Sequence, residues 1–283
     1  MSKKEFNWEW ELSNKTTWLG SSIKELYAYK DLLVRLVRKD ILMQYQQTMF
    51  GPLWVLLQPL LTVMTYLIVF NQVLKLPTGN IPPFLYYLSG ITLWNLFSEI
   101  LLNTASTFTR NAQIFGKVYF PRIIVPLSVM LLNCFQFAIQ FLFLLAAITY
   151  YHFTGRIDFS FADLLLCVPV VTVVSGIALG GGLIFSVITA KYRDLSAFLP
   201  IVIRLLMFLC PIFYSLSTVP QKVSWFVEYN PLAIQFEAFR YSLMKTGTIQ
   251  IGTFIYSAVA MVLLITAGLL LFNKKGDQLI DVA

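Results

Sequence analysis

The sequence predicts an all-α integral membrane protein with six transmembrane helices. Of its 283 residues, 58% are hydrophobic and only 12% are charged, whereas ordinary globular chains are about a quarter charged. Six apolar stretches each approach the ~20 residues that a bilayer crossing needs. Lysine and arginine gather in alternate connections between these stretches, which is the charge pattern of a multi-pass membrane protein.

The expected spans cover residues 53–74, 84–108, 123–150, 164–189, 195–214 and 254–272. With a cytoplasmic amino terminus, 15 of the 21 lysines and arginines fall on that side and 5 on the other, while Arg204 lies inside a span. This bias predicts that both termini are cytoplasmic, because basic loops stay inside. The net charge of +7 therefore has a topological explanation and is no sign of nucleic-acid binding.

Four segments are expected along the chain. Residues 1–20 form a polar cytoplasmic arm that lacks the apolar core of a signal peptide. Residues 21–50 form an amphipathic helix in the membrane interface, which begins at a capping box, Ser22-Ile23-Lys24-Glu25. One face of this helix is apolar, and its members are Ile23, Leu26, Leu33, Leu36, Val37 and Ile41. Residues 53–272 make the transmembrane domain, and residues 273–283 a cytoplasmic tail.

The stretch from Leu195 to Met244 starts as a membrane helix but is broken by Pro211, Pro220 and Pro231. Between residues 215 and 248 no run is apolar for long enough to cross a bilayer. The segment is nevertheless too aromatic for an ordinary solvent loop. We expect it to dip into the outer side of the membrane and return. Such a path requires that its backbone N–H and C=O groups are buried in protein or face a water-filled cavity. Two short helices lying on the membrane surface are the alternative.

Close helix packing is expected in the fourth span. Gly176 and Gly180 form a G-x-x-x-G pattern, with Gly181 and Gly182 beside them. Small residues at this spacing allow two helix backbones to approach each other. The partner helix can belong to the same chain or to a second subunit, and we favour the same chain.

Enzymatic chemistry is not expected, and we predict neither catalytic residues nor a metal site. Of the 14 acidic residues only Glu99 lies well inside a span, and the single histidine, His152, sits at a helix end. The chain lacks the G-x-x-x-x-G-K-[ST] loop that cradles phosphates. We therefore expect no cofactor in this chain, and if ATP drives it, a partner ATPase binds the ATP and Mg²⁺.

Candidate residues for a path through the membrane come from buried charges and from the proline-broken segment. Glu99 and Arg204 both lie ~15 Å deep, so they either pair or face a wet cavity separately. Aromatic rings in the broken segment can stack on sugar faces, although an ordinary interfacial belt also explains them. The path candidates are Glu99, Arg204, Phe213, Tyr214, Trp225, Tyr229 and Arg240.

The basic loop from Arg110 to Arg122 is a candidate docking site for a partner protein. We expect Phe115, Tyr119 and Phe120 to be exposed there, because aromatic and arginine side chains dominate interface hot spots. A loop that touches only lipid headgroups is the alternative. The complete set of coupling candidates is Arg35, Arg38, Arg110, Phe115, Lys117, Tyr119, Phe120 and Arg122.

Several motifs together resemble one family of transport proteins. They are Gln44 to Trp54 with Leu57-Gln58-Pro59, Lys117 to Arg122 with Pro126-Leu127, Tyr192-Arg193-Asp194, Pro211 to Tyr214, Val219-Pro220, Asn230-Pro231-Leu232, Phe239-Arg240 and Leu279 to Val282. This series, in order from about residue 30 to the end, is similar to the ABC-2 type permeases that export O-antigen, capsule and teichoic acid. Gln44 departs from the pattern, because many relatives have a basic residue there.

The resemblance implies a permease subunit of the cell inner membrane. Two copies would form a homodimer with two ATP-binding subunits, and the substrate would be an undecaprenyl-linked polysaccharide. The amphipathic helix and the first cytoplasmic loop would touch the ATPase. The alternatives are an ABC permease that exports teichoic acid, drugs or lipids, and a membrane enzyme of glycan assembly.

Overall fold

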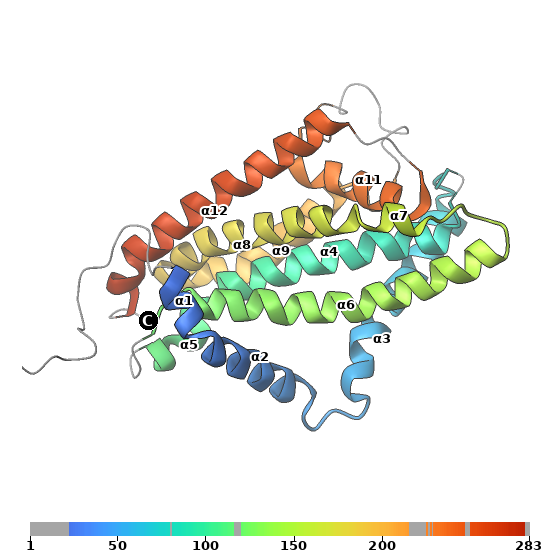
Figure 1. Ribbon diagram of the computed structural model, residues 1–283. Coiled ribbons are helices and arrows are strands. Elements are labelled where there is room, and N and C mark those ends of the chain that lie inside the picture. Colours follow the sequence, from blue (N-terminus) through green and yellow to red (C-terminus); the bar gives the residue numbers. More distant parts are fainter. Residues whose placement is uncertain are drawn as a thin grey trace, which may run out of the picture.

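A computed structural model describes residues 23–79, 81–115, 120–214, 225, 227, 229–246 and 250–280, without the side chains of 23–25, 112–115, 161–162, 193 and 275–280. Every regular element in these ranges is a helix, which confirms the predicted all-α class (Figure 1). The elements are α1 (Ile23–Ala28), α2 (Lys30–Tyr45), the 3-10 turn η1 (Gly51–Leu53), α3 (Trp54–Tyr66), the π-helix η2 (Leu67–Val73), α4 (Pro83–Ala105), α5 (Thr107–Phe115), α6 (Ile124–Phe153), α7 (Phe161–Leu164), α8 (Cys167–Lys191), α9 (Arg193–Leu206), the 3-10 turn η3 (Met207–Leu209), α11 (Pro231–Met244) and α12 (Ile251–Ile280).

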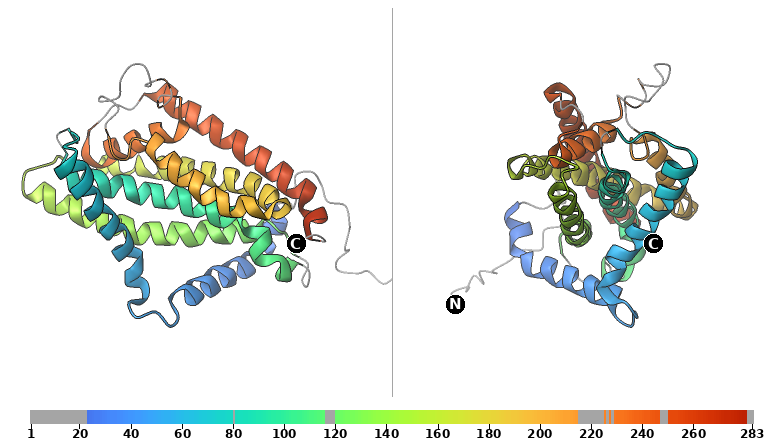
Figure 2. Two further views of the ribbon diagram at one scale, coloured as in Figure 1. Left: turned by 180° about the vertical axis from the view of Figure 1, so that it is seen from behind. Right: turned by 90° about the vertical axis from the view of Figure 1, so that its right-hand side faces the viewer.

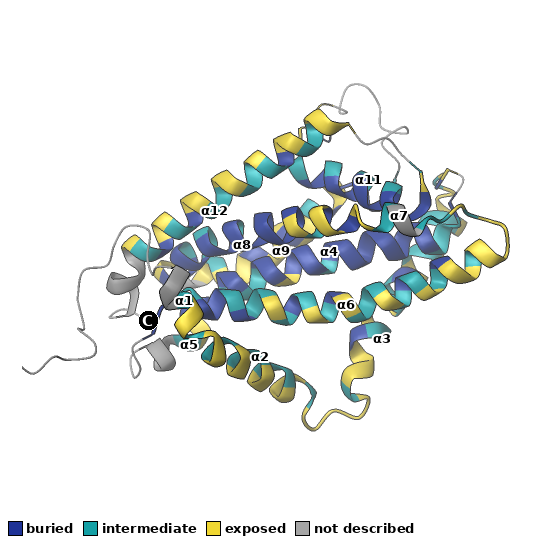
Figure 3. Cartoon of the chain, viewed as in Figure 1, coloured by how far each residue is buried: buried dark blue, intermediate teal, exposed yellow. Residues whose placement is uncertain are grey.

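Helices α4 and α8 form the centre of the bundle. Helix α8 packs most extensively against α12 and α4, and α4 also packs against α6 and α3. Figure 3 shows the consequence, since α4 and α8 are largely buried while α2 and α12 are exposed along much of their length. The buried faces of α4 and α8 make the core, and apolar side chains on the outer helices remain available to lipid or to another subunit.

The glycines of α8 create this centre. A Cβ atom at Gly180 would lie 2.6 Å from the Leu264 backbone, and one at Gly182 would lie 2.6 Å from the Thr104 side chain. On α12, a Cβ atom at Gly268 would lie 2.7 Å from the Gly180 carbonyl oxygen. The preferred interpretation of the G-x-x-x-G pattern is therefore confirmed, because its close packing is made within this chain.

Among the described residues, four helical stretches are long and apolar enough to cross a membrane: Gly51–Val73, Ile124–Phe153, Cys167–Lys191 and Ile251–Lys274. They match the first, third, fourth and sixth predicted spans to within a few residues. The second prediction falls on α4, a helix of 23 residues whose polar side chains, such as Asn95, Glu99 and Asn103, lower its hydropathy. The fifth falls on α9 and η3, and α9 has only 14 residues. Helix α12 continues to Ile280, beyond the predicted start of the tail.

The predicted interface helix is present as two consecutive helices, α1 and α2, which meet at Tyr29. Their apolar side chains pack against the start of α6, where Phe120, Ile124 and Val125 form a small separate core. After α2 the backbone turns sharply, with Gln47 at φ 62° and Gly51 at φ 51°. A positive φ favours glycine, which is the residue at position 51. The chain then enters α3.

The bundle has two distinct ends. Helices α1 and α5 and the carboxyl-terminal part of α12 lie at one end, which we call the proximal end (Figure 1). The connections from η2 to α4 and from α6 to α7 lie at the opposite end, the distal end, as the reverse view in Figure 2 also shows.

Candidate functional site

The fifth predicted span breaks near Pro211, and side chains take over the carbonyl groups that the break leaves free. All of the donors come from α4, from α11 and its amino-terminal cap, or from the break itself. The hydrogen bonds are Tyr214 Oη to the Phe208 carbonyl (3.3 Å), Asn230 Nδ2 to the Leu209 carbonyl (3.4 Å), Arg240 Nη2 to the Ile212 carbonyl (3.3 Å) and Tyr86 Oη to the Tyr214 carbonyl (2.6 Å). Because bilayer hydrocarbon offers no hydrogen bonds, such internal partners are what a broken helix at membrane depth requires.

Arg240 is the central member of this arrangement. Its side chain is only 2% exposed, and its guanidinium carbon lies 3.8 Å from the centre of the Tyr86 ring. Nη1 lies 3.6 Å from Glu237 Oε1 on the same helix. The guanidinium also fills the space beside Gly90, where a Cβ atom would lie 3.3 Å from Nη2. In this conformation Arg240 is enclosed by protein, so it presents no surface to a substrate.

Helix α11 is fixed at both ends. At its start, Asn230 accepts a hydrogen bond from the Leu232 amide at 3.0 Å, and Ser257 of α12 donates to the Pro231 carbonyl at 2.9 Å. At its end, Lys245 adopts a left-handed conformation with φ 54° and lies 3.3 Å from Asp163 beside α7. The helix is therefore held by α4, α12 and the α7 segment together.

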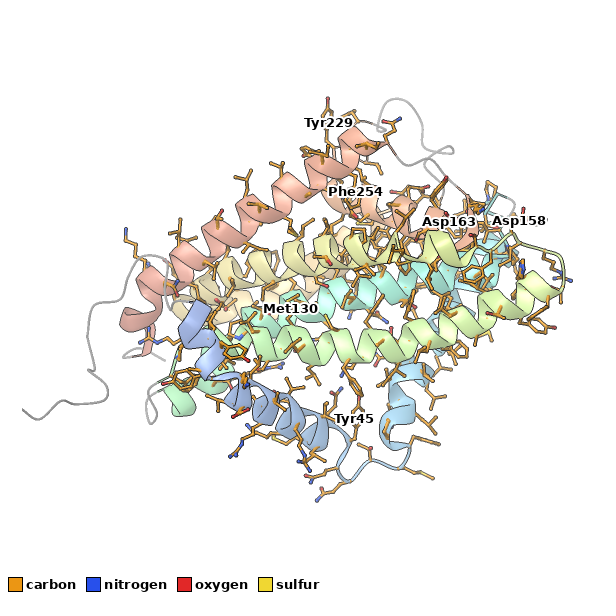
Figure 4. All side chains as sticks on the ribbon, viewed as in Figure 1. Tyr45, Met130, Asp158, Asp163, Tyr229 and Phe254 are labelled. Atoms are coloured by element: carbon orange, nitrogen blue, oxygen red, sulfur yellow. The ribbon has the colours of Figure 1, made fainter. Side chains whose placement is uncertain are left out.

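The four predicted aromatic path residues divide into two groups. Phe213 is 2% exposed and packs against Tyr66 and Phe70 of the first span, with ring centres 4.8 and 4.5 Å apart. Tyr214 is half-buried. By contrast, Trp225 and Tyr229 are 56% and 70% exposed, and Figure 4 shows Tyr229 pointing outward near the start of α12. Of this set, only Trp225 and Tyr229 present most of their rings to the outside.

Glu99 and Arg204 are both exposed, and no ion pair joins them within the part of the chain that the structure describes. Of the two interpretations, a Glu99–Arg204 pair or two separate charges, the structure favours separate charges. Glu99 instead accepts a hydrogen bond from Asn103 Nδ2 at 3.0 Å, and Arg110 Nη1 donates to Asn103 Oδ1 at 3.1 Å. Glu99, Asn103 and Arg110 thus form a polar row along α4 and α5 that is open to the outside.

A second polar connection was not predicted from the sequence. Pro59 inside α3 has no amide hydrogen, so the Val55 carbonyl four residues earlier has no helical partner. Gln140 Nε2 of α6 donates to this carbonyl at 3.2 Å, and Gln140 Oε1 accepts from Asn95 Nδ2 of α4 at 3.5 Å. Gln140 thereby joins three helices. Pro59 was the available signal, because a proline inside a helix always frees one carbonyl.

Helix α6 also contacts the end of α2. Gln136 Nε2 of α6 donates to Gln44 Oε1 at 2.7 Å. Figure 4 shows Tyr45 on the side of α2 that faces α6. Gln44 is the position that departs from the family pattern, and here an amide side chain makes the contact to α6.

The predicted coupling residues are only partly grouped. Arg35 and Arg38 are exposed on α2, and Arg110 is exposed on α5. Burial raises the pKa of the nearby Asp40 carboxyl, although the charge of Lys39 opposes the shift. Arg122 is half-buried. Lys117 and Tyr119 lie outside the described residues, as does the side chain of Phe115.

One expectation about the coupling loop is wrong. Phe120 is 7% exposed rather than open, because the apolar face of α1 and α2 covers it. Leu26, Leu33 and Leu36 of that face contact the core that Phe120 forms with the start of α6. A buried phenylalanine between these two elements joins them mechanically, so α1, α2 and the end of the loop form one unit.

Metal-ligating and thiol side chains are dispersed. No three His, Cys, Asp or Glu residues come together in the described ranges in a way that could hold a metal ion. His152 is exposed, and its Nδ1 lies 3.1 Å from the Ile157 carbonyl oxygen. The cysteines Cys134, Cys167 and Cys210 are all free.

Comparison with known proteins identifies the family. The model of the ABC-2 type transporter family matches residues 31–244. The chain is 30% identical to an O-antigen export system permease protein, RfbA, of Klebsiella pneumoniae over 86% of this chain and 92% of that protein. It is 28% identical to RfbA of Myxococcus xanthus over 74% and 79% of the two chains, and 23% identical to the polysialic acid transport protein KpsM of Escherichia coli over 86% and 92%. The relatives are transporter permeases rather than enzymes, and the chain belongs to the ABC-2 type transporter family.

Proposed function

We propose that this chain is the permease subunit of an ABC exporter that moves a lipid-linked polysaccharide, such as O-antigen, across the inner membrane. The relatives named for O-antigen export and polysialic acid transport support the substrate class, because the alignments cover nearly their whole length. The observation that carries the transport path is the polar row of Glu99, Asn103 and Arg110, which is open to the outside along α4 and α5. Such groups are costly against lipid, so they are expected to face protein or water.

A path between two copies of the chain accounts for this row. The first span has only 17% of its apolar window buried within the chain, compared with 67% for the fourth span. A second copy would cover part of that exposed surface and enclose the polar row. Trp225 and Tyr229 would then offer rings at the exit, where many weak contacts with sugar faces suit a sliding polymer.

The test is export in a strain that lacks the gene, complemented with variants. Wild-type protein should restore surface polysaccharide, and Trp225→Ala with Tyr229→Ala should reduce it without changing membrane assembly or basal ATP hydrolysis. Tyr150→Ala is the matched control, because Tyr150 is 66% exposed at the same end of the bundle. Normal export by the double variant would remove these rings from the path. Normal surface glycan in the deletion strain itself would favour a drug or lipid exporter.

Six crossings with both termini in the cytoplasm are part of the proposal. The distribution of lysine and arginine supports this orientation. Helix α1 and the end of α12 also lie at the same end of the bundle (Figure 1). A cysteine introduced at Ser160 should react with a membrane-impermeant label in intact cells, and one at Gln113 should not. Labelling of the cysteine at Gln113 from outside would show that the proposed orientation is wrong.

Energy would come from two separate ATPase subunits, which bind ATP and Mg²⁺. The exposed arginines of α2 and the end of the loop that Phe120 joins to them form the proposed docking unit. Arg35→Glu with Arg38→Glu should abolish stimulation of the ATPase by the permease. Lys75→Glu, an exposed cation at the distal end, should leave it unchanged. Equal losses in the two variants would argue that overall charge, not docking, matters.

A further inference from the structure

A pocket of about 680 Å³ opens at the distal end of the bundle, beside η2 and the start of α4. Its volume is in the usual range for small-molecule sites, roughly 300–1,000 Å³. The apolar part of its wall includes Leu67, Ile81 and Phe84, and the polar part includes Asn71, Thr78 and Arg156. The pocket therefore combines an apolar wall with a small set of polar groups.

The backbone around this pocket is held by specific contacts. Asn71 lies in the π-helix η2, whose last wide turn is closed by a hydrogen bond from the Leu74 amide to the Val69 carbonyl at 3.0 Å. Single π turns inside longer helices are frequent at functional sites. Thr78 is 9% exposed and donates to the Ile81 carbonyl at 3.0 Å, which fixes the connection to α4. The wall is thus formed by constrained backbone on this side.

Arg156 approaches from the other side, on the connection after α6. Its amide donates to the Tyr151 carbonyl at 3.1 Å, and its guanidinium carbon lies 6.0 Å from the centre of the Tyr151 ring. No carboxylate lines the pocket, and among the described residues Arg156 makes no ion pair. The Asn71 amide likewise has no hydrogen-bond partner in the described part of the chain. A guanidinium and a carboxamide are therefore both available to a ligand.

We propose that this pocket binds the phosphate headgroup of a membrane amphiphile. Arginine matches phosphate geometry with paired donors, and an asparagine amide can add a further donor. Basic pockets between membrane helices bind lipid headgroups by the same chemistry. The apolar wall beside the arginine would contact the adjoining hydrocarbon. The phosphate can belong to a resident phospholipid or to a polyprenyl phosphate carrier, and the pocket chemistry is common to both.

Binding to the purified full-length chain in a neutral detergent tests the proposal. The probes are dihexanoyl phosphatidylglycerol, undecaprenyl phosphate, dihexanoyl phosphatidylcholine and inorganic phosphate. Arg156→Gln should weaken binding of a phosphate lipid by at least about tenfold, which corresponds to roughly 1.4 kcal/mol. Asn71→Leu should weaken it less, and Arg156→Lys should restore only part of the loss. Lys245→Gln is the matched control, because Lys245 is a cation at the distal end that already pairs with Asp163.

The outcomes separate the sources and the alternatives. Arg156-dependent binding of phosphatidylglycerol alone identifies a resident lipid, and such binding of undecaprenyl phosphate alone identifies a carrier. Unchanged binding in Arg156→Gln, an equal loss in Lys245→Gln, or equally tight binding of inorganic phosphate would overturn the proposal. Arg156-dependent binding of phosphatidylcholine would count, like that of phosphatidylglycerol, as binding of a resident lipid. The measurement contains no transport step, so its result is independent of whether the chain exports a polysaccharide.

Discussion

Replacing Arg240 should destabilise the protein far more than replacing any exposed cation. Arg240→Ala removes a charged hydrogen bond to the Ile212 carbonyl, the contact with the Tyr86 ring and the partner of Glu237. A hydrogen bond to a charged group contributes about 1.5–3 kcal/mol, and a cation–π contact about 0.5–2 kcal/mol. Breaking a buried ion pair from one side costs about 3–5 kcal/mol. Because these contributions overlap, we expect a total loss of about 3–5 kcal/mol.

The assay is thermal unfolding of the purified chain in detergent. A loss of this size should lower the apparent melting temperature by roughly 6–20 °C, at about 2–4 °C for each kcal/mol in a chain of this size. Lys245→Met is the control on the same helix, since its side chain is 51% exposed and its pair with Asp163 is a surface pair. Such pairs contribute about 0–1 kcal/mol. The two variants compare a buried ion pair within α11 with a more exposed ion pair between the end of α11 and α7.

Arg240→Met distinguishes charge from volume. It fills much of the same space but leaves the Ile212 carbonyl unpaired, so it should rescue only part of the loss. Combined with Glu237→Gln, it should cost less than the sum of the single changes, because the two charges interact. An Arg240→Ala melting temperature within about 2 °C of wild type, or an equal loss in Lys245→Met, would refute the reasoning.

Two further predictions concern helix contacts. Gly180→Ala should cost about 1–3 kcal/mol, because its Cβ atom would lie 2.6 Å from the α12 backbone, which cannot rotate away; Gly252→Ala, with nothing within 4 Å, is the control in the same melting assay. Gln140→Leu should cost about 1–3 kcal/mol by leaving the Val55 carbonyl unpaired. Pro59→Ala should reduce that loss in the double variant, because alanine restores the missing amide donor; additive losses would show that the bond contributes nothing.

Predictions from the sequence were accurate where the determinants are local. Apolar length placed four spans, and the spacing of Gly176 and Gly180 predicted close packing, which involves only small side chains on one helix face. Contacts between residues that are far apart in the sequence could not be predicted from the sequence. Arg240 was expected to face a path because it belongs to the proline-broken segment. Its actual environment combines Tyr86, more than a hundred residues earlier, with a carbonyl that only the three-dimensional break exposes.

The error at Phe120 has a different cause. The loop sequence contains basic and aromatic residues, and this composition does not distinguish a docking surface from a contact within the chain. The apolar face of the preceding amphipathic helix was assigned to lipid, so no partner was left for Phe120 except another protein. In the structure Leu33 and Leu36 pack against the small core that Phe120 forms with the start of α6. An amphipathic face can be satisfied by its own chain as well as by a membrane.

Two prolines create the same physical problem at different places, and the chain solves it in the same way. Pro59 frees the Val55 carbonyl, and the break at Pro211 frees the Ile212 carbonyl; in each case a long polar side chain from another helix donates to it. A helix bent in this way cannot straighten or bend further without moving the helix that supplies the donor. The proline-containing turn of α3 is therefore linked to α6 and α4 through Gln140, and the break after α9 is linked to α11. In the proposed exporter, these side chains would transmit movement of the first and fifth spans to the helices that carry the polar row and the exposed rings.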